Sequence, residues 1–350
     1  MPNTDYTEKQ FETDIENSLI TTGGWEKATD AGYRKNPEMA LDIETLVQFV
    51  KTTQPIPWQR FEKQCNSDPY KKFYKAFEDA VLSDGMIGVL RHGFKYRGID
   101  FKVCYFKPES ELNTDAVKRY NQNICQCIRQ WHYSEKNKNS VDLLLSVNGI
   151  PLVATELKNQ FTGQSINNGK AQWMYDRDNR EPAFRLNHRI LVFFAVDLYQ
   201  AAMATQLKGK DTRFFPFNQG SNGPGVDGGA GNPARDDGKY VTSYVWEEVF
   251  QKDSLLDIFQ KFVQYEERKE IEVTDDGKEK NVTTKSVIFP RFHQLDVVRN
   301  LISDVKEEGP GKNYLVQHSA GSGKSNSIAW MAYRLASLHN NENKPIYNSV

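Results

Sequence analysis

Residues 141–159 read VDLLLSVNGIPLVATELKN, and this stretch decides the fold of the chain. It holds two apolar runs, at 141–147 and 151–157, which are separated by Asn148 and Gly149. An Asn-Gly pair between two apolar runs is a strong signal for a tight hairpin turn. The stretch therefore predicts a β-hairpin at the centre of a domain.

The segments around the hairpin complete the architecture. Residues 190–196 are apolar throughout and rich in β-formers, as expected for a strand buried on both faces. Residues 166–175 have a helical pattern, and residues 7–20 read as an amphipathic helix that Gly23 and Gly24 end. Together these segments predict an α/β fold in which helices flank a mixed sheet.

The hairpin carries charged side chains in strands that are otherwise apolar. Asp142 begins the first strand, and Glu156 and Lys158 share a face near the end of the second, because side chains alternate along a strand. Two carboxylates can hold Mg²⁺, and a lysine can orient water beside a phosphate. We assign Asp142, Glu156 and Lys158 as candidate catalytic residues, with Asp142 and Glu156 as metal ligands. The alternative is a solvated or structural role for these charges.

The register of the hairpin bears on this assignment. With Asn148 and Gly149 as the whole loop and regular pairing, Asp142 would face Thr155 and point away from Glu156. A shared metal needs both carboxylates on one face. We therefore predict an odd-length connection or a β-bulge between residues 142 and 156.

A second motif lies near the C-terminus. Residues 315–317 are expected to form a strand, residues 319–325 read SAGSGKS, and a helix is expected over 327–338. A strand, a glycine loop that ends in GKS and a helix are the parts of a phosphate-binding loop. The motif predicts binding of ATP and Mg²⁺. The expected nucleotide-binding residues are Gly321, Ser322, Gly323, Lys324 at the phosphates, and Ser325 in the shell of the metal.

The length of 350 residues suggests two domains. Residues 219–238 form a glycine-rich loop with no assigned role, and 246–267 read as one long helix. Residues 268–285 are charged, with a turn signal at Asp276, and read as a linker or an exposed hairpin. We predict a domain over 1–260, a linker over 261–285 and a second, incomplete domain over 286–350.

Composition limits the class of protein. The formal net charge is −1, so any surface that binds a polyanion must be a local patch. Four cysteines are too sparse for a disulfide scaffold, and the acidic N-terminus is unlike a signal peptide. The most apolar run is far too short to cross a bilayer. We expect a soluble, cytoplasmic protein with no membrane partner.

Both motifs resemble those of known families. SAGSGKS resembles motif I of superfamily 2 helicases, and PRFHQLD at 290–296 resembles the element whose glutamine reads adenine, which implies that role for Gln294. Residues 141–159, TGQS at 162–165 and Gln172 resemble the nuclease domain of the restriction (R) subunit of type I restriction-modification enzymes. The glycine-rich loop and YVWEE at 244–248 follow in the same order.

The resemblance implies a restriction-endonuclease-like fold with a PD-(D/E)xK centre. Asp142, Glu156 and Lys158 would form that centre, and Gln172 would support it from the adjacent helix. Glu8 or Glu12 of the N-terminal helix, and Tyr175, are further candidates. Where the family often has a tyrosine after the glutamine, this chain has Asp176, and Tyr175 stands one place earlier.

The resemblance also implies an activity and its partners. We expect a type I site-specific deoxyribonuclease that cleaves double-stranded DNA with Mg²⁺, coupled to an ATP-driven translocase and assembled with methylation and specificity subunits. The RecA-like P-loop lobe is expected to be incomplete, since no acidic Asp-Glu box follows Lys324, and to show no steady ATP turnover. The alternative is a DNA-binding or docking module of a helicase, with structural carboxylates.

Overall fold

The computed structural model describes residues 7–65, 67–109, 112–220, 230–273, 279–340 and 344–347. The α-helices are α1 (Glu8–Thr21), α2 (Ala31–Arg34), α3 (Ile43–Thr53), α4 (Pro55–Gln64), α5 (Pro69–His92), α6 (Thr114–Asn121), α7 (Ile166–Ala171), α8 (Lys252–Lys261), α9 (Phe292–Glu308) and α10 (Lys324–Ala336). The strands are β1 (Glu26–Ala28), β2 (Phe94–Tyr96), β3 (Ile99–Phe101), β4 (Cys125–His132), β5 (Ser140–Val147), β6 (Ile150–Leu157), β7 (Val192–Val196), β8 (Ala201–Ala204), β9 (Phe215–Pro216), β10 (Gln264–Val273) and β11 (Glu279–Ile288).

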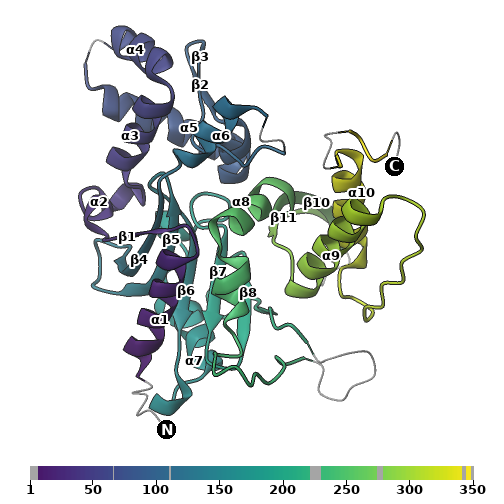
Figure 1. Cartoon of the computed structure of the whole chain (residues 1–350). Coiled ribbons are helices and arrows are strands. Elements are labelled where there is room, and N and C mark those ends of the chain that lie inside the picture. The colour runs from purple at the N-terminus through teal and green to yellow at the C-terminus, as the bar shows by residue number, and fades with distance from the viewer. Residues whose placement is uncertain are drawn as a thin grey trace.

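A seven-stranded sheet in the order β1-β4-β5-β6-β7-β8-β9 forms the centre of the molecule (Figure 1). β1 and β4 are parallel, as are β6 and β7, and the other neighbours are antiparallel. Every residue of β6 and β7 is buried, because helices cover both faces of the sheet. The predicted α/β fold, a mixed sheet flanked by helices, is confirmed.

The sheet separates two apolar cores. On one face, Phe11 of α1 and Leu255 of α8 share a core with Leu143 of β5. On the other face, Trp173 shares a core with Leu144 of β5. Trp173 lies in a π-helical turn, Gln172–Asp176, that continues α7, so the expected helix over 166–175 is present. α1 confirms the expected N-terminal helix.

The β5–β6 hairpin contains the predicted irregularity. Val147 pairs with Ile150 across a two-residue turn, but further along Leu145 pairs with Val153, so Leu152 is the extra residue of a β-bulge. Pro151, which has no N–H to donate, sits beside the bulge, where a proline is tolerated. Continued past Leu143 and Thr155, this register places Asp142 opposite Glu156.

Both turn residues are held by other parts of the chain. Asn148 and Gly149 have positive φ angles of 54° and 78°, as a turn that matches the strand twist requires. The buried Asn148 side chain accepts from the Ile124 N–H at 2.7 Å and donates to the Val103 carbonyl at 2.8 Å. The Gly149 carbonyl accepts from the Asp42 N–H, and a Cβ on Gly149 would lie 2.3 Å from the backbone carbonyl oxygen of Asp42.

The C-terminal part contains α9 and α10 and differs from the predictions in one strand. Residues 315–317 form no strand, and Leu315 is 93% exposed. A strand needs a neighbouring strand to pair its N–H and C=O groups, and no described segment lies in position to do so. α10 begins at Lys324, three residues before the expected start. The incomplete RecA-like lobe stays a prediction, as do the domain boundaries at 260 and 285.

The expected helix over 246–267 is wrong. Residues Val245–Val249 form a π-helical turn, α8 follows, and the chain joins β10 at Gln264. The break at Phe250 has a tertiary cause, because the Phe250 carbonyl accepts from the Trp25 indole at 2.7 Å. The Lys252 N–H, in turn, donates to the Gly23 carbonyl.

β10 and β11 form an antiparallel hairpin, one of the two readings of the charged segment over 268–285. Its predicted turn at Asp276 lies outside the described residues, as do residues 221–229 of the glycine-rich loop. Within the described ranges, no helix is long and apolar enough to cross a membrane.

The turn at Gly149 leads to a first prediction. Gly149→Ala should lower the free energy of unfolding by about 3 kcal/mol, because it adds a clash with Asp42 to the cost of a left-handed conformation. Gly98→Ala is the matched control, since Gly98 has a φ of 80° but no atom within 4 Å of the added Cβ. Urea denaturation measures both. Equal losses would show that the contact with Asp42 contributes nothing.

Candidate functional site

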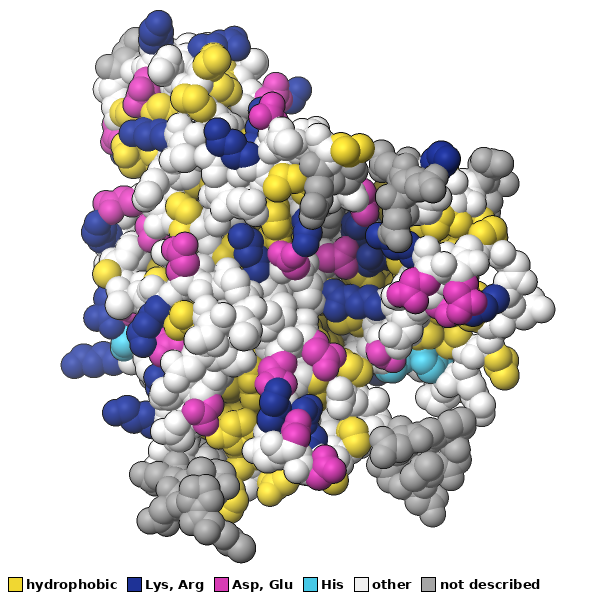
Figure 2. Space-filling view, viewed as in Figure 1, with side chains coloured by type: hydrophobic (Ala, Val, Ile, Leu, Met, Phe, Trp, Pro, Cys, Tyr) yellow, Lys and Arg dark blue, Asp and Glu magenta, His cyan; other side chains and the backbone are white. Residues whose placement is uncertain are grey.

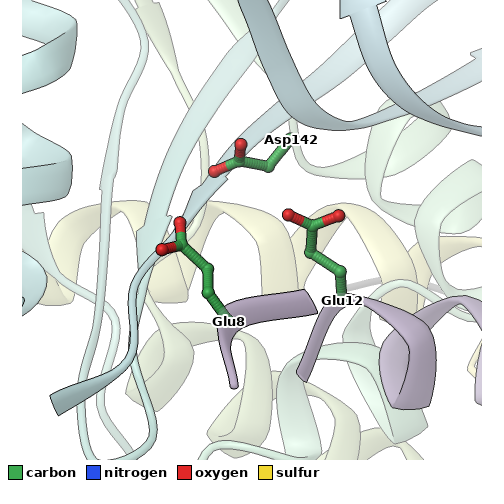
Figure 3. A group of neighbouring side chains, drawn as sticks. All are labelled: Glu8, Glu12 and Asp142. Carbon is green, nitrogen blue, oxygen red and sulfur yellow. The ribbon is translucent and has the colours of Figure 1, made fainter. Parts of the chain in front are cut away.

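Acidic side chains from two elements, α1 and β5, meet at one end of the β5–β6 hairpin. Glu8 and Glu12 come from the first two turns of α1, which the Thr7 side chain caps by accepting from the Gln10 N–H. Figure 3 shows both glutamates extending from α1 toward Asp142 of β5. One oxygen from each of the three residues lies within 4.8 Å of the others. The sequence left Glu8 and Glu12 as alternatives, and the structure brings both to Asp142.

Lys158 lies among these acids. Its ammonium Nζ is 3.1 Å from Glu8 Oε1 and 3.7 Å from Asp142 Oδ2. Asp142 Oδ2 also accepts from the Leu157 N–H at 2.7 Å. Burial lowers the pKa of Lys158, but Asp142, Glu8 and Glu156 outweigh that effect and raise it above its usual value. Lys158 therefore stays protonated at neutral pH and acts as a cation.

Glu156 is fully buried on β6 and is held by Arg177. Its Oε1 accepts from Arg177 Nη2 at 2.6 Å and from Nε at 3.1 Å. Its Oε2 accepts no hydrogen bond from the described residues, and the carboxyl group of Asp142 lies within hydrogen-bonding reach of the Glu156 carboxyl group. Burial raises the pKa of Glu156 well above its usual range, and nearby Asp142 adds to this, while Arg177 opposes it. A buried carboxylate oxygen without a donor raises the free energy of the folded state unless a proton or a cation binds to it.

These positions fit a divalent cation. Carboxylate oxygens are the donors that Mg²⁺ prefers, and those of Glu8, Glu12 and Asp142 are grouped closely enough to share one ion. The predicted pair, Asp142 and Glu156, lies close enough for Asp142 to raise the pKa of Glu156. Glu156 is not in the group of three, however, because Arg177 holds it. Its open Oε2 is the atom that a cation or a bound water would satisfy.

Three residues at the site were not found by sequence reasoning. Arg129 of β4 bonds to Glu12 Oε2 at 2.7 Å, and Gln130 donates to Glu12 Oε1 at 3.1 Å. Burial raises the pKa of Glu12, with a further contribution from Asp142, against the effect of Arg129. Arg177 lies in the DRD stretch after Gln172, but nothing in its spacing indicates a partner on β6. Arg129 and Gln130 gave no signal at all.

Gln172 and Tyr175 are not drawn into the cluster. Gln172 is half-buried where α7 passes into the π-helical turn, and the described contacts include no hydrogen bond from it to a site carboxylate. Tyr175 is 70% exposed. The helix itself is adjacent, because a Cβ on Gly169 would lie 3.4 Å from Lys158 Cγ. A supporting role for Gln172 stays a prediction.

The glycine loop at 319–325 has a partner in α9. The buried Gln294 donates to the Gly323 carbonyl at 2.8 Å and accepts from the Arg291 N–H at 2.9 Å. Gly321 and Gly323 have positive φ angles of 73° and 84°. Lys324 donates to the carbonyl of Ser319 at 2.9 Å.

The remaining loop residues surround the start of α10. The Ser322 hydroxyl is buried and has no partner among the described residues, and Ser325 is exposed on the first turn of the helix. Nucleotide binding by these residues stays a prediction.

The fold and the site together define a class. A mixed sheet with Asp142, Glu156 and Lys158 at the end of a central hairpin is a nuclease-like fold. Residues 5–214 match the family model described as the type I restriction enzyme R protein N terminus, and the chain belongs to this family. The match covers both strands of the hairpin and the whole carboxylate cluster. A search of curated proteins found no match.

The Glu156–Arg177 pair gives a second prediction. Arg177→Met should cost about 3–5 kcal/mol of stability, because it leaves Glu156 buried without its counter-charge. Adding Glu156→Gln to that variant should recover part of the loss, since no buried charge then remains. Urea denaturation of the single and double variants at neutral pH gives the coupling energy.

The matched control is Arg180→Met, which removes an exposed arginine that pairs with Asp178. The loss of such an exposed pair should change stability little, because solvent screens both charges. If Arg177→Met were no more destabilising than Arg180→Met, the buried pair would not hold Glu156.

Proposed function

We propose that this site hydrolyses the phosphodiester backbone of double-stranded DNA with Mg²⁺. The observation that carries the proposal is the grouping of Glu8, Glu12 and Asp142 oxygens within 4.8 Å, beside a buried Glu156 oxygen that lacks a partner. Carboxylates this close repel one another; Lys158 offsets part of that repulsion, and a divalent cation would offset the rest. Membership of the R-protein family makes DNA the expected substrate.

The acidic residues of the site would bind the metal ion, and Lys158 would contact the phosphate. Asp142, Glu8 and Glu12 would hold the ion, and Glu156 Oε2 would complete its shell or hold a water beside it. A bound Mg²⁺ supplies charge neutralisation at the phosphate and lowers the pKa of its water. Lys158, which keeps its proton, would orient the phosphate and offset the negative charge that develops during cleavage.

Docking without catalysis is the rival function. A structural role would leave every buried carboxylate oxygen with a donor. Each acid of the cluster has at least one donor, but Oε2 of the buried Glu156 accepts from none of the described residues. The orphaned Oε2 of Glu156 favours catalysis instead.

We further propose that the loop at 319–325 binds ATP for a DNA translocase in the complete protein. Gln294 already contacts this loop. Among the described residues, the Lys324 ammonium donates to the carbonyls of His318 and Ser319, so it can turn to a phosphate. Methylation and specificity subunits would supply target recognition. Charges of both signs are interspersed over the face in Figure 2, so DNA contact would rest on local patches and on those partners.

The two chemistries should separate, which is the third prediction. In the complete protein assembled with its partners, Lys158→Ala should lower DNA cleavage by about 10²–10³, because a group acting on the transition-state charge is lost. DNA-stimulated ATP hydrolysis should survive. Lys324→Ala should abolish hydrolysis, and cleavage should fall with it if translocation precedes cutting.

Plasmid linearisation and phosphate release measure the two activities side by side. Lys95→Ala is the matched control, since Lys95 is exposed on the β2–β3 hairpin and pairs there with the exposed Asp100. Linearisation at the normal rate by Lys158→Ala would place the nuclease centre elsewhere.

A further inference from the structure

Gln130 has an unusual backbone for its place in the sheet. It lies within β4 but has a positive φ of 50°, a left-handed conformation that costs a non-glycine residue about 1–2 kcal/mol. The register of β4 against β5 is nevertheless the same before and after Gln130, since Arg129 pairs with Leu143 and Trp131 pairs with Val141. Gln130 therefore lies across from Asp142. Contacts of its side chain must hold it there.

The side-chain amide joins two carboxylates. Nε2 donates to Glu12 Oε1 at 3.1 Å and to Asp142 Oδ1 at 3.3 Å, while Oε1 accepts from the Ser140 hydroxyl at 2.6 Å. The orientation of the amide follows from chemistry, because ionised carboxylates only accept and a serine hydroxyl can donate. Each amide hydrogen thus has its own carboxylate.

The second carboxylate oxygen of Glu12 and that of Asp142 accept hydrogen bonds from groups other than Gln130. Glu12 Oε2 accepts from Arg129, and Asp142 Oδ2 accepts from the Leu157 N–H. Gln130 sets the spacing between the two acids, since it bonds to one oxygen of each. It does so without a charge, so it offsets their repulsion yet does not compete with a cation as a lysine or arginine would.

We propose that Gln130 is a positioning residue that holds Glu12 and Asp142 at the separation at which they share a divalent cation. The inference rests on the proposed metal-dependent function. Groups that hold metal ligands from behind, without touching the ion, commonly change metal affinity by about 10–100-fold when they are removed. The strained backbone of Gln130 is retained because its amide reaches both acids from that position.

Gln130→Gly is the sharpest test, because glycine adopts a positive φ freely and the variant loses only the side chain. Mn²⁺ binding to the whole chain is measured by calorimetry, and thermal unfolding is followed in parallel. We expect Mn²⁺ affinity about 10–100-fold weaker, with a melting temperature close to that of the unchanged chain, because relief of the strained backbone offsets the lost hydrogen bonds and the greater freedom of glycine in the unfolded chain. Gln130→Asn, which tolerates the same φ but has a shorter reach, should also weaken binding.

The matched control is Arg97→Gly. Arg97 has a φ of 44° in the β2–β3 turn, so the variant relieves a similar strain and should leave Mn²⁺ affinity unchanged. In the assembled enzyme, Gln130→Gly should raise the Mg²⁺ concentration for half-maximal cleavage and leave the rate at saturating Mg²⁺ within a few-fold. A purely structural role would instead lower the melting temperature and the saturating rate together.

The outcomes separate this inference from the function on which it rests. If Asp142→Ala loses Mn²⁺ binding while both Gln130 variants bind as tightly as the unchanged chain, the positioning role is overturned and the metal site stands. Weak binding by Gln130→Gly together with a large drop in melting temperature overturns it as well. If the unchanged chain binds no Mn²⁺, or if Asp142→Ala binds it as tightly as the unchanged chain, the metal site and the inference fall together.

Discussion

The pairing of β5 with β6 sets the positions of Asp142 and Glu156 relative to each other. A regular two-residue hairpin would turn Asp142 and Glu156 to opposite faces of the sheet, and the extra residue Leu152 shifts the register by the one place that brings them together. The turn cannot slide to another register, because the Asn148 side chain and the Gly149 carbonyl bond to segments outside the hairpin. α1 and α7 then pack against a central hairpin whose register is already determined.

Charge repulsion is the second constraint, and the structure meets it with one donor for each acid. Lys158 lies against Glu8, Arg177 holds Glu156 and Arg129 holds Glu12. Asp142 accepts hydrogen bonds from a backbone N–H and from the amide of Gln130, and the Lys158 ammonium lies 3.7 Å from its Oδ2. A carboxylate at the centre of the group whose hydrogen-bond donors are neutral is the one most available to a cation. Asp142 shares the Lys158 ammonium with Glu8, so its negative charge is only partly compensated.

Much of this was predictable from local patterns. The strands, the Asn-Gly turn and α1 follow from periodicity, and the bulge follows from counting residues between two acids that must share a face. What the sequence could not give depends on distant partners. The helix expected over 246–267 breaks because Trp25, far away in the chain, bonds to Phe250. Arg177 and Gln130 reach the site through tertiary contacts that their spacing in the sequence does not indicate. The strand expected at 315–317 does not form among the described residues.

The glycine loop and the carboxylate cluster belong to one packed structure. The Trp330 indole of α10 donates to the Phe262 carbonyl at 2.9 Å, and Arg334 pairs with Asp257 of α8 at 3.0 Å. The segment before α8 contacts α1, where the rings of Phe11 and Trp246 are 5.7 Å apart. Substitutions at Trp330 would therefore disturb both parts through packing.

Lys324 behaves differently, because it is exposed and, among the described residues, it donates to the carbonyls of the nearby His318 and Ser319. Its removal leaves the contacts of α10 with α8 in place. An effect of that removal on cleavage would then pass through the nucleotide, since the packing that joins α10 to the nuclease sheet is unchanged.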